Sequence, residues 1–304
     1  MHNHFKKKTS KGSNVTTYVL YHDDADGYAS AMCVYLISGD KASYIPVQYG
    51  QAFPIFLNDL KPTDNIFILD FSYKEEILET VREKVCSLTV IDHHETAMRD
   101  LEHLSYAIFD MSKSGARLSW EYFHPNTPAP MIVKLVEDRD LWKFTIEDTK
   151  TFDAGMRSTG KYKDIKYWVE VHRNPSLLEQ LIHDGRLLVK DLESRVNSFV
   201  KNPSKYKLVD IDGHKVAVYN TTDNISELGN AFNTTLDIDY SISYFFTNEG
   251  ELVLSYRGKK GHVHVGDLCK KLGGGGHAAA AGVKLPIEAG LAWLNNIYCK
   301  EEVK

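Results

Sequence analysis

The sequence predicts an α/β protein of two domains: a doubly wound, mostly parallel sheet followed by a second, smaller α/β domain. Two observations lead to this prediction. Through the first half of the chain, apolar runs rich in β-branched and aromatic residues alternate with helix-like runs, which is typical of a parallel sheet covered by helices. The chain of 304 residues also exceeds the usual size of a single hydrophobic core.

The expected elements of the first domain follow in order. A first strand is expected at Thr17–Tyr21, and the small apolar residues of 27–37 that come after it have helical periodicity. A second strand at Ser43–Val47 contains a proline and is therefore expected at a sheet edge. Further strands are expected at 65–70, 87–92 and 105–109, and helices at 74–84, 114–123 and 131–136.

A long helix-like stretch, from Pro175 to about Val200, ends at Asn202-Pro203 and separates the two domains. It is either a rigid connector or a packed helix, and the sequence does not distinguish the two. Beyond it, strands are expected at 215–219, 239–246 and 251–256. The expected boundaries are a poorly ordered tail at 1–14, a first domain at 15–175, a helical connector at 176–203 and a second domain at 204–304.

Acidic and histidine side chains gather where three strands of the first domain end. They are His22, Asp24 and Asp26 after the first strand, Asp70 after the third, and Asp92, His93 and His94 after the fourth. The first three occupy alternate positions, so an extended backbone would direct them to one face. A single motif of this kind is more often a solvated turn, but the carboxyl ends of parallel strands meet at one edge, where three such ends predict a metal site.

These motifs, in this order, resemble the DHH phosphoesterases, a family named after its Asp-His-His triplet. The family pattern continues with an Asp after a helix, here Asp138, with Asp140 as the alternative. The second domain resembles the DHH-associated C-terminal domain, which binds substrate in many members, through Ser255-Tyr-Arg257 and through Gly273–Gly276 followed by His277. The resemblance covers the chain from about Val15 to its end.

The resemblance implies two divalent cations, with Asp70 as the bridge between them. The implied ligands are His22, Asp24, Asp26, Asp70, His93 and Asp138. Asp92 is expected to orient His93, which leaves His94 to contact the phosphate or to aid the leaving group. Carboxylates and imidazoles without thiolates suit Mn²⁺, with Mg²⁺ or Zn²⁺ as alternatives. Two such cations, about 3.5–4 Å apart, stabilise both the attacking and the leaving oxygen of a phosphoryl displacement.

The glycine-rich stretch of the second domain is expected to bind the substrate phosphate, because glycines let backbone N–H groups approach an anion closely. A flexible turn is the alternative. Residues 250–272 carry five Lys and Arg against two Asp and Glu, a local net charge of +3 that favours an anion site. The implied substrate-binding residues are Arg257, Gly274, Gly275, Gly276 and His277. Trp142, Tyr162, Tyr167 and Trp168 are weaker candidates for stacking bases, since core packing is their more frequent role.

Composition narrows the class of protein. The net charge of −5 argues against broad coating of nucleic acid, and no apolar run approaches the roughly 20 residues that a membrane helix requires. The four cysteines lie far apart, without the spacing of a zinc knuckle or a redox motif. With no secretory signal visible, we expect a cytoplasmic protein without a membrane partner.

The sequence therefore predicts an enzyme that hydrolyses short oligonucleotides or linear dinucleotides to mononucleotides. The alternatives within the enzymes are hydrolysis of a cyclic dinucleotide, of polyphosphate or of a nucleoside bisphosphate, and a RecJ-like single-strand exonuclease. Outside the enzymes, the alternative is a nucleic-acid-binding scaffold. The choice between RNA and DNA, the direction of attack and the oligomeric state, a homodimer included, are left open.

Overall fold

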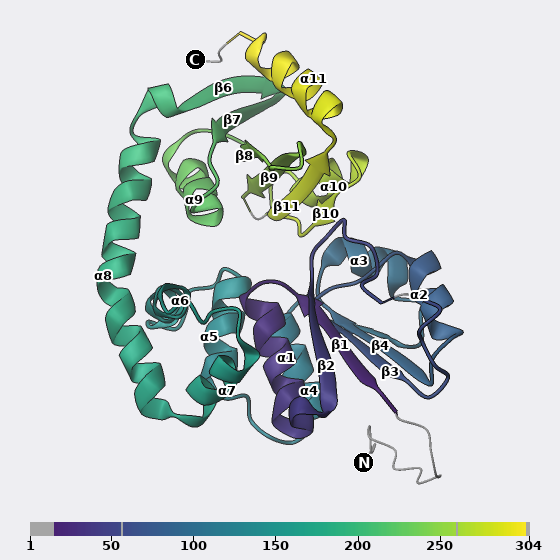
Figure 1. Cartoon of the computed structure of the whole chain (residues 1–304). Coiled ribbons are helices and arrows are strands. Elements are labelled where there is room, and N and C mark those ends of the chain that lie inside the picture. The colour runs from purple at the N-terminus through teal and green to yellow at the C-terminus, as the bar shows by residue number, and fades with distance from the viewer. Residues whose placement is uncertain (1–14, 56, 260, 302–304) are drawn as a thin grey trace.

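The computed structural model describes residues 15–55, 57–259 and 261–301, so the tail expected at 1–14 lies outside the described residues. Two sheets, one of five strands and one of six, form two domains that the long helix α8 spans (Figure 1). The predicted fold class is confirmed: a parallel, helix-covered sheet is followed by a second α/β domain.

The first sheet is parallel throughout, in the order β2-β1-β3-β4-β5. Its strands are β1 (Thr17–His22), β2 (Ala42–Val47), β3 (Asn65–Leu69), β4 (Ser87–Asp92) and β5 (Ala107–Phe109). β2 is an edge strand, as Pro46 predicted. Because the chain reverses its direction across the sheet at β1, the carboxyl end of β1 is the place where open α/β sheets bind ligands.

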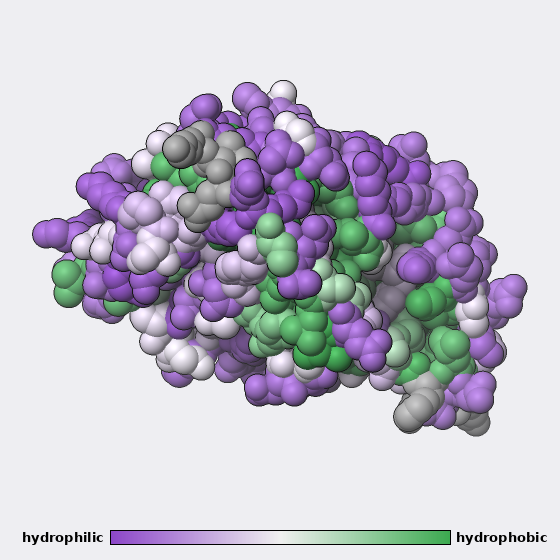
Figure 2. Space-filling model, turned by 90° about the horizontal axis from the view of Figure 1, so that it is seen from above, coloured by the Kyte–Doolittle hydropathy of each residue, from purple (hydrophilic) through white to green (hydrophobic). Residues whose placement is uncertain are grey.

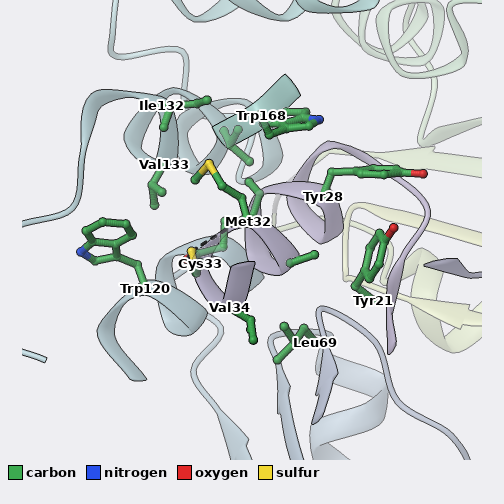
Figure 3. Packing of buried hydrophobic residues seen from close by; sticks show 14 of the residues in the cluster. Tyr21, Tyr28, Met32, Cys33, Val34, Leu69, Trp120, Ile132, Val133 and Trp168 are labelled. Atoms are coloured by element: carbon green, nitrogen blue, oxygen red, sulfur yellow. Dashed lines mark hydrogen bonds between the residues drawn. The ribbon is translucent and has the colours of Figure 1, made fainter. Parts of the chain in front are cut away.

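Helices cover both faces of this sheet. They are α1 (Ala25–Ser38), α2 (Glu75–Arg82), α3 (Glu95–Leu101), α4 (Gly115–Phe123), α5 (Met131–Asp140), α6 (Thr149–Ser158) and α7 (Ile165–Arg173). The apolar helix α1 lies in the centre of one face, where Met32 and Cys33 pack among Trp120, Ile132 and Trp168 (Figure 3). This packing fixes the helix that follows β1, and with it the turn that carries the first acidic motif.

The helix α8 (Pro175–Val200) packs on both domains. Two glycines allow its first half to cross α6 closely: a Cβ on Gly185 would lie 1.8 Å from the carbonyl oxygen of Thr151, and one on Gly155 would lie 2.0 Å from that of Leu181. Its last turns contribute Val196 and Val200 to the core of the second domain. The helix is therefore both a connector and a packed element, which the sequence had left as alternatives.

The second sheet has the order β10-β11-β9-β8-β7-β6. Its strands are β6 (Tyr206–Ile211), β7 (His214–Asn220), β8 (Tyr240–Phe246), β9 (Leu252–Gly258), β10 (Gly275–Gly276) and β11 (Ala280–Leu285). The helix α9 (Ile225–Thr235) packs with the end of α8 on one face, and α10 (Val265–Lys271) and α11 (Ile287–Tyr298) cover the other. The strands expected at 215–219, 239–246 and 251–256 correspond to β7, β8 and β9.

The outer face of the second domain shows hydrophobic side chains in a band among hydrophilic ones (Figure 2). On α11, Ile287, Leu291 and Tyr298 are exposed to 45%, 54% and 51%. No partner for this surface is present in the described chain, and a homodimer stays a prediction. Among the described residues, no helix combines the length and the apolar character needed to cross a lipid bilayer.

The two domains touch next to the Asp-His-His triplet. The backbone N–H of Gly276 in β10 donates to Thr96 Oγ1 in α3 (3.1 Å). Arg99 pairs with Asp267 of α10 at 2.7 Å, and Lys270 pairs with Asp100 of α3 at 2.7 Å. These contacts hold the glycine-rich segment of the second domain over the carboxyl edge of the first sheet.

Candidate active site

The turn between β1 and α1 places the first three candidate ligands. The extended alternation holds only as far as Asp24, because α1 begins at Ala25. Asp24 is the N-cap of the helix and accepts a hydrogen bond from the N–H of Gly27 (3.0 Å), while its other oxygen lies 3.0 Å from His22 Nδ1. A Cβ on Gly27 would lie 1.9 Å from the carbonyl oxygen of His22, so glycine is required for the helix to start so close to the strand.

Asp70 lies at the centre of the cluster. It follows β3 with a φ of 55° and is 1% exposed. Its Oδ1 is 3.0 Å from His93 Nε2, and its Oδ2 is 3.9 Å from His22 Nδ1. A Cβ on Gly115, the first residue of α4, would lie 2.5 Å from the Cβ of Asp70. The N–H of Gly115 donates to Asp26 Oδ2 (2.6 Å), so the start of α4 holds Asp26 beside Asp70.

Asp138 and Asp140 both lie in the last turn of α5, and the structure brings only Asp140 to the cluster. Asp140 Oδ2 lies 3.5 Å from His93 Nε2. The carboxylate of Asp138 instead accepts four hydrogen bonds of 2.6 to 3.1 Å from the loop that follows, namely from the N–H and hydroxyl of Thr145, the N–H of Ile146 and the hydroxyl of Thr149. The preferred assignment of Asp138 as a ligand therefore does not fit this geometry, whereas Asp140 fits it.

Asp92 contacts His94 and not the ring of His93. Its Oδ1 lies 2.7 Å from His94 Nδ1 and accepts a hydrogen bond from the backbone N–H of His93 (2.7 Å). Burial raises the pKa of Asp92, but the neighbouring His94 outweighs it and holds that pKa well below its usual range. The expectation that Asp92 orients His93 is corrected, because the chain turns after β4 and brings His94 to the carboxylate. His94 is then held with its Nε2 available to a ligand.

The cluster holds more negative charge than its own residues can balance. Burial and the neighbouring carboxylates Asp26 and Asp24 raise the pKa of Asp70 and of Asp140 well above the usual range. Burial alone would lower the pKa of His22, but Asp24 raises it to about 9. Several buried polar atoms lack a hydrogen-bond partner in the described part of the chain: His22 Nδ1, both oxygens of Asp70, Asp92 Oδ2, His93 Nδ1 and Asp140 Oδ2.

This donor set fits divalent cations. Unpartnered carboxylate and imidazole atoms that face one another are the ligands that Mn²⁺, Mg²⁺ and Zn²⁺ accept. His22, Asp24 and Asp70 can place ligand atoms within 4.8 Å of one another, and so can Asp26, Asp70 and His93. The two triads share Asp70, the position from which one carboxylate can bridge two ions.

The second domain brings His277 to the same place. Its ring stacks on that of His94 with centroids 4.5 Å apart, and lies 4.9 Å from the ring of His93. Burial and then the neighbouring His94 lower the pKa of His277 well below its ordinary value, so its ring is neutral at pH 7. Arg257, at the end of β9, donates from Nη2 to Ser226 Oγ in α9 (3.0 Å). Of the predicted residues of the second domain, His277 thus lies at the cluster and Arg257 lies beside α9.

The glycines before His277 serve close packing more than anion binding. The N–H groups of Gly273, Gly274 and Gly276 donate to Lys270 O, Cys269 O and Thr96 Oγ1, so they are not free for a phosphate. A Cβ on Gly274 would lie 2.1 Å from the carbonyl oxygen of Gly282, and Gly276 has a φ of 138°. The expected amide cradle does not fit these contacts: glycine is required there because β10 lies against β11 and α3.

Some residues near the cluster could not be predicted from the sequence, because they lie in no recognisable motif. The ring of Tyr49 lies 5.2 Å from His22 and 5.7 Å from His94, and it is 43% exposed at the mouth of the cluster. Glu95 accepts from His264 of the second domain at 3.0 Å. Tyr49 lies in a loop without a recognisable pattern, and the pairing of Glu95 with His264 joins positions 169 residues apart, so neither left a local signal.

Comparisons with known proteins agree with this fold. The model of the DHHA1 domain family matches residues 213–297. The uncharacterized protein R106 of Acanthamoeba polyphaga mimivirus is 27% identical over 87% of this chain, which spans 66% of the length of R106. Oligoribonuclease NrnB of Bacillus subtilis (strain 168) is 22% identical, with 89% of this chain and 73% of NrnB aligned.

Among solved structures, RecJ of Thermus thermophilus in complex with Mn²⁺ superposes with a TM-score of 0.52 at 12% identity. The match covers 92% of this chain and 51% of RecJ. At that identity the likeness concerns the fold, and it includes both domains of this chain.

Proposed function

Since residues 213–297 match the DHHA1 domain family and the chain is similar to oligoribonuclease NrnB, we propose that it is a divalent-metal-dependent phosphodiesterase of the DHH/RecJ-like superfamily that hydrolyses short oligonucleotides or linear dinucleotides to mononucleotides. One observation above all supports a hydrolytic metal centre: two triads of possible ligands share the buried Asp70, whose oxygens lie beside His93 and His22 but form no hydrogen bond in the described chain. Buried carboxylates without partners are costly unless a cation balances them.

The proposed ligands are His22, Asp24, Asp26, Asp70, His93 and Asp140, with Asp140 in the place expected for Asp138. Two bound cations would activate water and stabilise the charge that develops on the phosphoryl oxygens. Mn²⁺ is the proposed ion, and Mg²⁺ or Zn²⁺ are alternatives for the same oxygen and nitrogen donors.

The remaining polar groups would position the substrate. Asp92 holds His94 by a 2.7 Å contact, so the free Nε2 of His94 can reach the scissile phosphate or the leaving oxygen. The neutral ring of His277 stacks on His94 and limits its motion. Arg257 adds a fixed positive charge beside α9 of the second domain. These groups come from both domains, so the substrate would be bound in the cleft between them.

A short substrate is favoured because the two domains contact each other at α3, which leaves less room there for a long strand. The ion pairs of Arg99 with Asp267 and of Lys270 with Asp100 join the domains there. A long strand would gain few contacts beyond the cleft, and the net charge of −5 repels additional phosphates. The similarity to oligoribonuclease NrnB supports the same substrate class. The cytoplasmic location expected from the sequence stays a prediction.

A substrate panel with purified protein and Mn²⁺ tests the proposal. It compares a length series of oligonucleotides from two to about twenty nucleotides with a cyclic dinucleotide, polyphosphate and a nucleoside bisphosphate. We expect hydrolysis that excess chelator abolishes, and a kcat/KM that falls with length. Asp24→Ala should lose activity, while Asp237→Ala, at a fully exposed position, serves as the control. Full activity in chelator contradicts the metal mechanism, and a kcat/KM that climbs with length favours a RecJ-like exonuclease.

A further inference from the structure

A second cavity lies beside the metal centre, between the two domains. It has a volume of about 580 Å³, which is in the range of small-molecule sites. The end of α5 and the helix α6 form one side, α8 another, and α9 of the second domain a third, as the arrangement in Figure 1 shows. No ligand is assigned to it by the proposed catalytic chemistry.

Two residues of the cavity adjoin the proposed catalytic residues. Arg139, which lines it, directly precedes the proposed ligand Asp140. Ser226, which also lines it, accepts the hydrogen bond from Arg257. A substrate whose phosphate lies at the metal centre near Arg257 therefore has this cavity as the adjoining space.

One wall is aromatic and rests on a strained loop. Trp142 and Phe144 have φ angles of 55° and 48°, a region that bulky side chains rarely adopt and that costs roughly 1–3 kcal/mol per residue. The four hydrogen bonds that Asp138 accepts hold the next residues of this loop. The guanidinium of Arg139 lies 4.4 Å from the ring centroid of Trp142. Strain of this kind persists only where the surrounding structure holds it, and it is frequent at ligand sites.

The charges that line the cavity are paired with one another. Arg139 contacts Glu227 at 2.6 Å and Asp153 at 3.5 Å, Lys150 contacts Glu193 at 3.0 Å, and Arg157 contacts Asp153 at 3.0 Å. Among the lining residues these three cations and three acids give a net charge of zero. A phosphate would have to compete with a carboxylate for each cation, so the cavity does not suit an anion.

The uncharged polar groups are those that lack partners. The side-chain amides of Asn197, Asn224 and Asn230 line the cavity and form no hydrogen bond within the described part of the chain. An amide offers two donors and one acceptor oxygen, the pattern that pairs with the edge of a nucleobase. Aromatic rings and an arginine plane supply the stacking surface that bases prefer.

We propose that this cavity is a nucleoside subsite, which takes the base and sugar of the nucleotide next to the scissile phosphate. The inference rests on the proposed function and sharpens it. Polyphosphate has no group for a neutral cavity of aromatic rings and amides, whereas a linear dinucleotide fills both the metal centre and the cavity. With this subsite, the enzyme recognises a second nucleoside next to the scissile phosphate, and a longer strand adds little.

Abasic dinucleotides test the subsite. The substrates are a 5′-phosphorylated dinucleotide and its two derivatives that lack one base each, assayed with Mn²⁺ for kcat/KM. For the wild-type protein, one derivative should be poorer by about tenfold or more, the size of a lost base stack. Asn230→Trp fills the cavity from an exposed position of α9. It should lower kcat/KM for the full dinucleotide by a similar factor and abolish the penalty for the missing base, because the two changes remove one interaction.

Two further variants complete the experiment. Asn197→Trp fills the cavity from α8, so the test still stands if Asn230→Trp fails to fold. Asn296→Trp on α11, outside the cavity, is the control and should leave every rate unchanged. If folded Asn230→Trp or Asn197→Trp keeps the wild-type kcat/KM and the abasic penalty, the subsite is wrong while the enzyme is a dinucleotide hydrolase. If the wild-type protein hydrolyses no nucleotide with Mn²⁺, the proposed function fails, and the subsite with it.

Discussion

The proposed metal centre and the proposed nucleoside cavity differ in how their buried charges are balanced, although they lie on either side of the same helix end. In the metal centre, the carboxylates of Asp70 and Asp140 lie among other acids, and burial and these neighbours raise the pKa of both. In the cavity, every cation of the lining is paired with an acid of the lining. The difference indicates what each site is built to accept: the first lacks positive charge, and the second lacks only a neutral partner.

Three consecutive residues at the end of α5 show this difference between unpaired and paired charges. Asp140 faces His93 in the metal centre, and Arg139 faces Glu227 in the cavity. Asp138 belongs to neither site, because its hydrogen bonds hold the loop that carries Trp142. A carboxylate whose oxygens already accept four hydrogen bonds stabilises a structure, whereas one without partners is available to a metal.

The largest effect is expected for Asp70→Asn. Loss of the bridging carboxylate should lower activity by more than the roughly 100-fold seen when a partner outside the ligand sphere is removed. In the metal-free protein, the same variant should be more stable at pH 7 than the wild type. The raised pKa of Asp70 means that its ionised form, populated as pH rises, destabilises the folded state. Denaturant unfolding in chelator measures this, with Asp237→Asn as control, and a less stable variant would contradict the unpaired-charge interpretation.

Replacing each of the two acids of α5 by asparagine in turn tests the contrast directly. Asp140→Asn should lose activity by about 100-fold or more, since it removes a proposed ligand, and should raise the melting temperature in chelator, since burial and neighbouring acids raise the pKa of Asp140. Asp138→Asn should instead cost roughly 2–4 kcal/mol of unfolding free energy, because hydrogen bonds to a charged acceptor contribute about 1.5–3 kcal/mol each and are not additive. Activity assays and urea unfolding of both variants separate the roles. The reverse pattern would restore Asp138 as the ligand.

The sequence could predict which acidic and histidine residues meet at the edge of the sheet, because strand ends are local signals. Apolar strands that end in Asp70 or in Asp92-His93-His94 place these residues at one edge of a parallel sheet, whatever packs around them. The choice between Asp138 and Asp140 could not be predicted in this way. They lie two residues apart on a helix and therefore point to different sides, and only the packing of residues 145–149 determines which side is the metal centre.

The cavity left no signal in the sequence. Its walls come from α5, α6, α8 and α9, which meet only because α8 packs on both domains. The glycine run was a signal with two physical meanings, close packing and anion binding, and the contacts of Gly274 with Gly282 favour the first. Likewise, Asp92 was expected to orient His93, but the turn after β4 brings His94 to its carboxylate.

Metal affinity should depend on pH because the centre is protonated when it is empty of cations. The neighbouring Asp24 raises the pKa of His22 to about 9, so metal-free protein at pH 7 carries a proton there that must leave when an ion binds. Each proton released makes the apparent Kd for Mn²⁺ fall by about tenfold for each unit that the pH rises below about 9, and the Kd levels off above that pH. Calorimetry in two buffers of different ionisation enthalpy counts the protons.

The control for this titration is a histidine outside the centre. His22→Gln should reduce the slope by one proton, whereas His103→Gln, an exposed residue that pairs with Glu75, should leave it unchanged. A slope that is flat for the wild-type protein would mean that the centre is ionised without metal. The contrast with the charge-balanced cavity would then lose its electrostatic basis.

The smallest effect concerns the paired charges of the cavity. Arg139 and Glu227 join the two domains, and their side chains are 18% and 28% exposed. A double-mutant cycle of Arg139→Met and Glu227→Gln should give a coupling of about 1–2 kcal/mol in unfolding free energy. This lies between the 0.2–1 kcal/mol of exposed pairs and the roughly 3–5 kcal/mol cost of breaking a buried one.

The pair of Lys166 with Asp40 provides the matched comparison, because its atoms are 2.9 Å apart but its side chains are 63% and 74% exposed. Water screens this pair, so the same cycle should give a coupling below about 1 kcal/mol. In the metal-free centre, a cycle of Asp70→Asn and Asp140→Asn should give the opposite sign, since removing either acid relieves the other of repulsion. Equal coupling for Arg139–Glu227 and Lys166–Asp40 would mean that the cavity is as wet as the surface. The stacking and amide contacts proposed for a nucleoside would then be too weak to select it.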